Sequence, residues 1–132
     1  MIGLANDIYS YKLERTTNQD ANNLITILMK EKGFSLQRSV DYVGDQFKSL
    51  LDVFNKNEAC LPSFDAEGDE ALRRYILSTK QSIIGYMHWC FDTHRYFTPE
   101  DGDVRRTLIV RLTDDALDER AMRTNTGPEN SK

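Results

Sequence analysis

The sequence has few cysteines and prolines and lacks any long apolar run. Its 132 residues include two cysteines, Cys60 and Cys90, and three prolines. Disulfide frameworks and cysteine-based zinc sites need more thiols at closer spacing, so neither is predicted, and reduced cytosolic thiols are the default. No stretch approaches the roughly 20 apolar residues that a helix needs to cross a bilayer. The N-terminus also lacks the basic region of a signal peptide, so we expect a cytoplasmic chain without a membrane span.

An excess of positive charge is also absent. The formal net charge is −4, and the arginines are scattered along the chain and form no basic run. Both features argue against a nucleic-acid partner. With 39% hydrophobic and 29% charged residues, the composition is typical of a globular chain of at most one domain.

The first third of the chain has the periodicity of short amphipathic helices. Apolar residues recur every three or four positions, which predicts one helix over about residues 2–15 and a shorter one after it. Asp20 is the expected N-cap of the shorter helix, and Gly33 is placed to end it. The apolar edge of this shorter helix consists of Leu24, Ile27 and Leu28.

Two long helices are predicted in the middle of the chain. Ser35 is a suitable N-cap for the first, whose apolar stripe we expect to pack in the core. Residues 55–68 read as a connecting loop, and the second long helix begins at Asp69 and runs to about residue 91. Gly85 interrupts it at a cost of about 1 kcal/mol relative to Ala, so we expect a packing or ligand-approach reason for this glycine. The stripe of the first long helix consists of Leu36, Val40, Val43, Phe47, Leu50, Leu51 and Phe54.

Oxygen-bearing side chains form a stripe on the opening helix. Asn6, Ser10 and Glu14 are spaced by four, so they lie on one helix face over roughly 12 Å. An amide, a hydroxyl and a carboxylate suit Mg²⁺, which accepts few protein ligands when a phosphate supplies the rest. The same spacing also describes an ordinary solvated helix face, and spacing alone favours that interpretation.

Two motifs connect the sequence to a known family. NDIYSYKLE, residues 6–14, resembles the second metal-binding motif of class I terpene synthases, N-D-x-x-S-x-x-x-E. Its filling residues Ile8, Tyr9 and Tyr11 resemble those of fungal sesquiterpene cyclases. WCFDTHRYF, residues 89–97, resembles the W-x-x-x-x-x-R-Y-F segment near the end of the same enzymes. The resemblance covers about residues 2–112.

This resemblance implies a fold, a reaction and a set of site residues. The fold would be all-α, with residues 1–112 forming the C-terminal portion of the terpene synthase helical domain and 113–132 a polar, disordered tail. The activity would be that of a lyase that ionises a prenyl diphosphate, such as farnesyl diphosphate, and cyclises the carbocation. The implied metal ligands are Asn6, Ser10 and Glu14 for one Mg²⁺, and the implied diphosphate ligands are Arg95 and Tyr96.

The implied residue types suit the chemistry. Charge that develops on a leaving diphosphate is stabilised by cations and donors placed in advance, and arginine offers a rigid fork that matches phosphate oxygens. The interpretation requires Arg95 to lie within a side chain's reach of the opening helix and not to turn outward. Lys12 departs from the family, which often carries its basic residue one position later, so a diphosphate contact from Lys12 is not expected.

The aspartate-rich motif of the family, D-D-x-x-D, is missing from its usual place before the N-D-x-x-S-x-x-x-E segment. Asp114, Asp115 and Asp118 have its spacing, but they follow the R-Y segment in a polar tail, and we expect no metal there. The expectation is therefore the C-terminal part of a cyclase that is inactive alone. The alternative is a non-catalytic helical module that pairs with another chain through an exposed apolar surface.

Overall fold

The computed structural model describes residues 1–112, and within them every regular element is helical. The all-α prediction is confirmed, whereas the predicted tail at 113–132 lies outside the described residues. None of the helices in the described range is both long and apolar enough to span a membrane. The elements are α1 (Ile2–Thr16), η1 (Asp20–Asn22), α2 (Leu24–Lys32), α3 (Leu36–Ala59), α4 (Ala66–Asp92), η2 (Pro99–Asp101) and α5 (Val104–Thr107).

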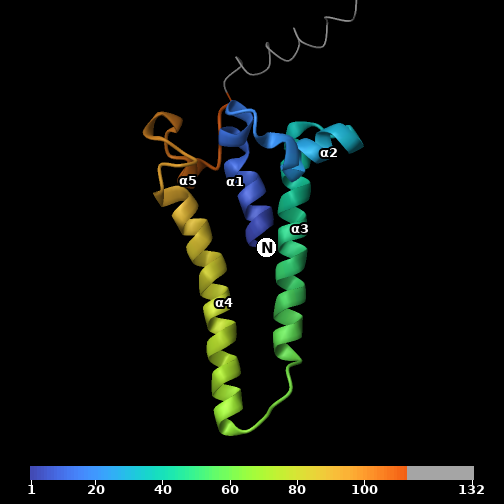
Figure 1. The fold of residues 1–132 in the computed structure, drawn as a ribbon, viewed down its shortest axis with the longest axis vertical. Coiled ribbons are helices and arrows are strands. Elements are labelled where there is room, and N and C mark those ends of the chain that lie inside the picture. The colour runs from blue at the N-terminus through green and yellow to red at the C-terminus, as the bar shows by residue number, and fades with distance from the viewer. Residues whose placement is uncertain (113–132) are drawn as a thin grey trace, which may run out of the picture.

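Two long helices, α3 and α4, form the arms of a hairpin (Figure 1). The connection between them, residues 60–65, lies at one end, and α1 lies between the arms toward the other end. The short helix α2 lies beside the start of α3. The helix that carries the oxygen stripe is therefore central, with one arm on each side.

The core consists of two clusters, one on each side of α1. Tyr11 of α1 packs in the first, together with buried residues of α2 and α3, whereas Tyr9 and Leu13 pack against the second, beside α4. Because residues 9 and 11 point in directions about 200° apart on a helix, α1 bridges the clusters. The buried residues of the first cluster are Tyr11, Ile25, Leu28 and Val43, and those of the second are Cys90, Tyr96, Phe97 and Val104.

Two of the predicted helix boundaries are confirmed, and one cap differs. Gly33 ends α2 in the left-handed conformation, with φ 63°, and the Ser35 hydroxyl accepts from the Arg38 amide at the start of α3. The N-cap of α2 is Asn23, whose Oδ1 accepts from the backbone N–H of Ile25 at 3.0 Å. The predicted cap was wrong because Asp20 lies a few residues earlier, in η1.

The connection between the long helices is shorter than predicted. Residues 60–65 replace the expected 55–68, because α3 continues to Ala59 and α4 begins at Ala66. Asp65 caps α4 by accepting from the Gly68 amide at 2.7 Å. Gly68 therefore lies in the first turn of α4 and not in the connecting loop.

The half of α3 near the connection to α4 differs most from expectation. Val43 is fully buried, but Leu50 and Leu51 on the same stripe are 44% and 37% exposed. The prediction that the whole stripe packs in the core was wrong because α1 and α2 cover only the beginning of α3. The expected packing reason for Gly85 is not found either, because a Cβ added there would meet no described atom within 4 Å.

Candidate metal and diphosphate site

The oxygen stripe of α1 lies between the two core clusters. Tyr9 lies on the side of α1 that faces α4, and Tyr11 lies on the side that faces α2 and α3. Asn6, Ser10 and Glu14 occupy the face between these directions, with Ser10 buried and the other two half-buried. Each of the three contacts a different neighbour.

The side chain of Asn6, on α1, contacts both α4 and the segment after α4. Its side-chain nitrogen Nδ2 donates to the hydroxyl of Tyr86 at 2.8 Å and to that of Tyr96 at 3.3 Å. The structure thus brings the first predicted metal ligand into contact with one of the two predicted diphosphate ligands, 90 positions away in sequence.

Ser10 and Glu14 are also held by hydrogen bonds. The Ser10 hydroxyl donates to the main-chain carbonyl of Asn6 at 2.7 Å. One carboxylate oxygen of Glu14, Oε2, accepts from Nδ2 of Asn23 at 3.0 Å. The same amide nitrogen donates to the carbonyl of Asp7 at 2.9 Å, so the N-cap of α2 fixes the position of the acidic end of the stripe.

Arg95 lies beside Tyr96, on the outer side of this contact. Its guanidinium carbon is 5.5 Å from the centroid of the Tyr96 ring, in cation–π range. The side chain is exposed, and it makes no ion pair or hydrogen bond with α1 or with any other part of residues 1–112. Arg95 thus approaches the site only through Tyr96. Its side chain is turned to solvent, so the requirement that it not turn outward is not met, and its diphosphate role rests on the resemblance alone.

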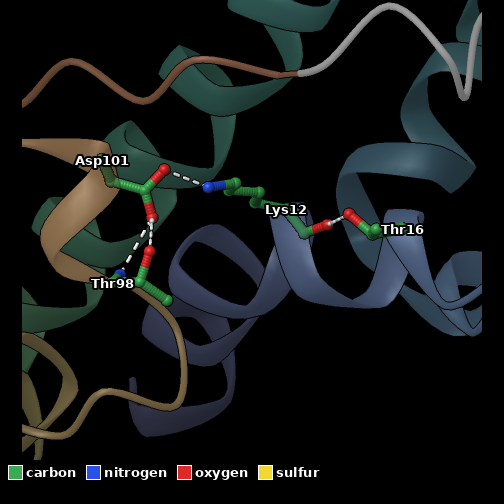
Figure 2. A network of polar contacts seen from close by, with 4 residues as sticks. All are labelled: Lys12, Thr16, Thr98 and Asp101. Carbon is green, nitrogen blue, oxygen red and sulfur yellow. Dashed lines mark hydrogen bonds and ion pairs between the residues drawn. The ribbon is translucent and has the colours of Figure 1, made fainter.

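Lys12 is engaged elsewhere, as Figure 2 shows. Its ammonium pairs with one carboxylate oxygen of Asp101, and the other carboxylate oxygen accepts from the Thr98 backbone N–H at 2.9 Å. Burial would raise the pKa of Asp101, but the hydrogen bonds from Lys12 and Thr98 lower it overall. Lys12 therefore has a partner within the chain.

Two further groups near the stripe have perturbed pKa values. Burial raises the pKa of the Asp7 carboxyl, the Leu24 backbone N–H partly opposes this, and Glu14 adds to it. Burial also raises the pKa of the Tyr86 hydroxyl. This effect outweighs the hydrogen bond from Asn6, which lowers the pKa. Tyr86 is therefore neutral throughout the physiological range.

Asn23, Tyr86 and Asp101 are functional-site neighbours that sequence reasoning missed. Asn23 had a local signal, because it directly precedes an apolar helix in the position of an N-cap. Asp101 also had one, because Thr98 and Asp101 have the spacing of a capping box. Tyr86 had none, since its contact with Asn6 spans 80 positions of the chain.

The donor set fits a hard divalent cation. Both hydrogen bonds of the Asn6 side chain use its nitrogen, which leaves the amide oxygen as an acceptor. Within residues 1–112, Oε1 of Glu14 likewise accepts no hydrogen bond. Oxygen donors with a single carboxylate suit Mg²⁺. Residues 1–112 hold no cluster of three His, Cys, Asp or Glu side chains, and the D-D-x-x-D-like residues Asp114, Asp115 and Asp118 lie outside the described residues.

Comparison with known proteins shows which family this helical chain resembles. Residues 1–52 match the family model described as terpene synthase family 2, C-terminal metal binding. That segment contains the whole oxygen stripe and the Asn23 that supports it. The resemblance is thereby confirmed, and the chain is related to the C-terminal region of the terpene synthases.

The relatives that the chain matches include sesquiterpene synthases of fungi. The chain is 38% identical over 112 residues to sesquiterpene synthase Agr3 of Cyclocybe aegerita, covering 85% of this chain and 31% of that protein. It is 37% identical to sesquiterpene synthase 6 of Postia placenta, with 85% and 32% covered, and 36% identical to alpha-muurolene synthase of Coprinopsis cinerea, with 85% and 26% covered. The chain thus spans 26–32% of the length of these three relatives.

Proposed function

We propose that this chain carries one side of a Mg²⁺-dependent sesquiterpene synthase site, which ionises a prenyl diphosphate of the farnesyl type. The observation that carries the proposal is the hydrogen bond between Asn6 and Tyr96. It joins the oxygen stripe of the opening helix to the R-Y segment, and these are the two motifs that the resemblance assigns to one diphosphate. The relatedness to fungal sesquiterpene synthases supports the substrate class.

Each residue has a role that its chemistry allows. Asn6, Ser10 and Glu14 would hold the cation, which supplies positive charge opposite the leaving diphosphate. Arg95 presents unpaired donors suited to phosphate oxygens, and the Tyr96 hydroxyl lies next to Asn6 to donate to the same group. Tyr96 is held beside Asn6, whereas Arg95, which is exposed, would have to turn toward the diphosphate to complete the donors that a leaving anion requires.

Aromatic side chains continue from this site along α4. The Trp89 ring is 5.9 Å from that of Tyr96 and 6.0 Å from that of Tyr86, centroid to centroid, and Trp89 is 46% exposed. Aromatic faces favour positive charge, so this group would form part of the wall along which a carbocation is guided.

We propose further that the isolated chain does not cyclise farnesyl diphosphate. Apolar side chains toward the connection between α3 and α4, such as Leu51 and Leu77, are exposed, and the chain spans about three tenths of its relatives. We therefore infer that the described residues supply only part of the wall of the substrate pocket. Incubation of the chain with farnesyl diphosphate and Mg²⁺, followed by gas chromatography of volatile products, tests this. A hydrocarbon product would contradict it.

Calorimetric titration with Mg²⁺ and inorganic pyrophosphate tests the binding role. Glu14→Ala removes the charged ligand and should reduce Mg²⁺-dependent pyrophosphate binding by at least tenfold. Glu31→Ala on α2 is the matched control, because Glu31 is exposed and has no contact with the stripe; it should bind as the unmodified chain does. Equal binding by both variants would place the cation elsewhere.

A second candidate function is a helical interaction module, and the exposed apolar surface of the long helices favours it. Under this alternative, Glu14→Ala leaves association with another chain unchanged, whereas polar substitutions on that surface abolish it. Analytical ultracentrifugation of Glu14→Ala and Ile84→Ser distinguishes the two outcomes. The exposed apolar residues on α3, α4 and their connection are Tyr42, Leu50, Leu51, Val53, Leu61, Phe64, Tyr75, Leu77, Ile84 and Trp89.

A further inference from the structure

The side chain of Asn6 is held from one side by two phenol groups. Tyr86, on α4, accepts from its Nδ2 at 2.8 Å, and Tyr96 accepts from the same nitrogen at 3.3 Å. The ring of Tyr86 packs against the second core cluster, which contains the fully buried Cys90 one helical turn further along. Tyr86 is partly buried, and its packing against this cluster positions its hydroxyl beside Asn6.

The geometry determines where the other end of the amide points. A side-chain amide has two donor hydrogens on its nitrogen and an acceptor on its oxygen. Because the group is planar, an Nδ2 held by both hydroxyls leaves Oδ1 directed away from them. An Asn that is free to rotate would lose side-chain entropy when its oxygen binds a cation, but one that is already held loses less.

The Tyr86 hydroxyl can accept from Asn6 and still donate its own proton elsewhere. Groups of this kind, one step outside the ligand shell, orient ligands, and their loss typically reduces metal affinity 10- to 100-fold.

We infer that Tyr86 is a positioning residue for the metal site: its hydroxyl holds the Asn6 amide so that Oδ1 faces the cation. The inference rests on the proposed function for the identity of the cation site. Tyr86 itself contacts no metal or substrate, and it acts through Asn6.

Side-chain amide resonances of Asn6 in the full 132-residue chain test the hold directly, without metal. Tyr86→Phe removes only the hydroxyl, and Tyr75→Phe on the same helix is the matched control, since Tyr75 is 72% exposed. We expect two dispersed, slowly exchanging Asn6 amide protons in the unmodified chain and in Tyr75→Phe. In Tyr86→Phe they should move toward solvent-exposed values and exchange faster. Unchanged Asn6 resonances in Tyr86→Phe would overturn the inference.

Titration with Mn²⁺ as a paramagnetic substitute for Mg²⁺ tests the consequence for the ligand. Tyr86→Phe should weaken Mn²⁺ binding about tenfold, with a melting temperature close to that of Tyr75→Phe. In an Asn6→Asp background, the loss of Mn²⁺ affinity caused by Tyr86→Phe should shrink to about twofold or less. A carboxylate offers two equivalent oxygens, so it does not need to be oriented by Tyr86. A tenfold loss in both backgrounds would overturn a role through Asn6.

The two experiments separate failure of the inference from failure of the proposed function. If the unmodified chain binds no Mn²⁺, the proposed cation site and the ligand half of the inference are both overturned. The Asn6 resonances would still decide whether Tyr86 holds the amide. If Mn²⁺ binds and Tyr86→Phe changes neither readout, the cation site stands and the positioning role of Tyr86 is wrong.

Discussion

The ammonium of Lys12 on α1 pairs with the carboxylate of Asp101 at the end of η2. The pair is well shielded, since the side chain of Asp101 is 7% exposed and that of Lys12 is 23% exposed. It connects the central helix to the turn that follows the R-Y segment (Figure 2). This ion pair and the contact between Asn6 and Tyr96 hold the same segment against α1 at two points.

Breaking this tether should destabilise the fold. Lys12→Met keeps the aliphatic stem and leaves the Asp101 carboxylate without its partner, which should cost about 1–2 kcal/mol, between the values for exposed and fully buried pairs. Urea denaturation followed by circular dichroism measures the loss. Arg73→Gln is the control, because its pair with Glu70 is exposed on both sides and should change stability by less than about 0.5 kcal/mol. Similar losses in both variants would contradict a structural tether.

The contribution of the pair should depend on pH in a defined direction. Burial raises the pKa of Asp101, but the bonds from Lys12 and Thr98 outweigh it, so its folded-state pKa lies below 3.8. A carboxylate with a lowered pKa stabilises the fold above its unfolded pKa and loses that contribution as the pH falls through the folded pKa. The stability difference between the unmodified chain and Lys12→Met should therefore be constant from about pH 5 to 8 and shrink below pH 3.8. A difference that instead shrinks above pH 7 would contradict this assignment.

Asp7 should show the opposite pH dependence. Burial raises its pKa above 3.8, with Glu14 adding to the rise and the Leu24 backbone N–H opposing it. Its charge therefore opposes folding as the pH rises through the folded pKa, and the penalty is absent below 3.8. Asp7→Asn keeps an oxygen for the Leu24 amide, so it should be more stable than the unmodified chain at pH 7 and equal to it near pH 3.

The control for Asp7→Asn is Asp52→Asn, on the exposed face of α3. Chemical denaturation at pH 3, 5 and 7 compares the three chains. Asp52→Asn should differ little from the unmodified chain over this range, because an exposed carboxylate pays no burial penalty. A stabilisation that is the same at pH 3 and pH 7 would show that the charge of Asp7 is not its cause.

Local sequence signals predicted the helices. They could not predict the contacts between helices that are far apart in the sequence. Periodicity found α1 and the long helices, and Gly33 and Ser35 marked their boundaries through backbone and capping chemistry. Spacing of four placed Asn6, Ser10 and Glu14 on one face, because helix geometry alone determines this. Their supporting residues follow from packing instead.

Burial was the property that periodicity misjudged. Val43 and Leu50 belong to the same apolar stripe, yet the first is fully buried and the second is 44% exposed. A repeat of three or four residues identifies the apolar face of a helix, but it says nothing about what covers that face. The contact of Tyr86 with Asn6 was missed for a related reason, since it depends on how α4 crosses α1.

Gly85 provides the simplest test of the long helices. It lies inside α4 and is exposed, and a Cβ added there would meet no described atom within 4 Å. Because glycine costs about 1 kcal/mol relative to alanine in a helix interior, Gly85→Ala should stabilise the chain by about this amount, a rise in melting temperature of roughly 4–8 °C for a domain near this size. Gly33→Ala is the opposite control: its φ of 63° is strained for any side chain, so it should destabilise the fold by about 1 kcal/mol. Loss of stability in Gly85→Ala would mean that α4 packs closely against another surface in solution, and would favour the interaction-module alternative.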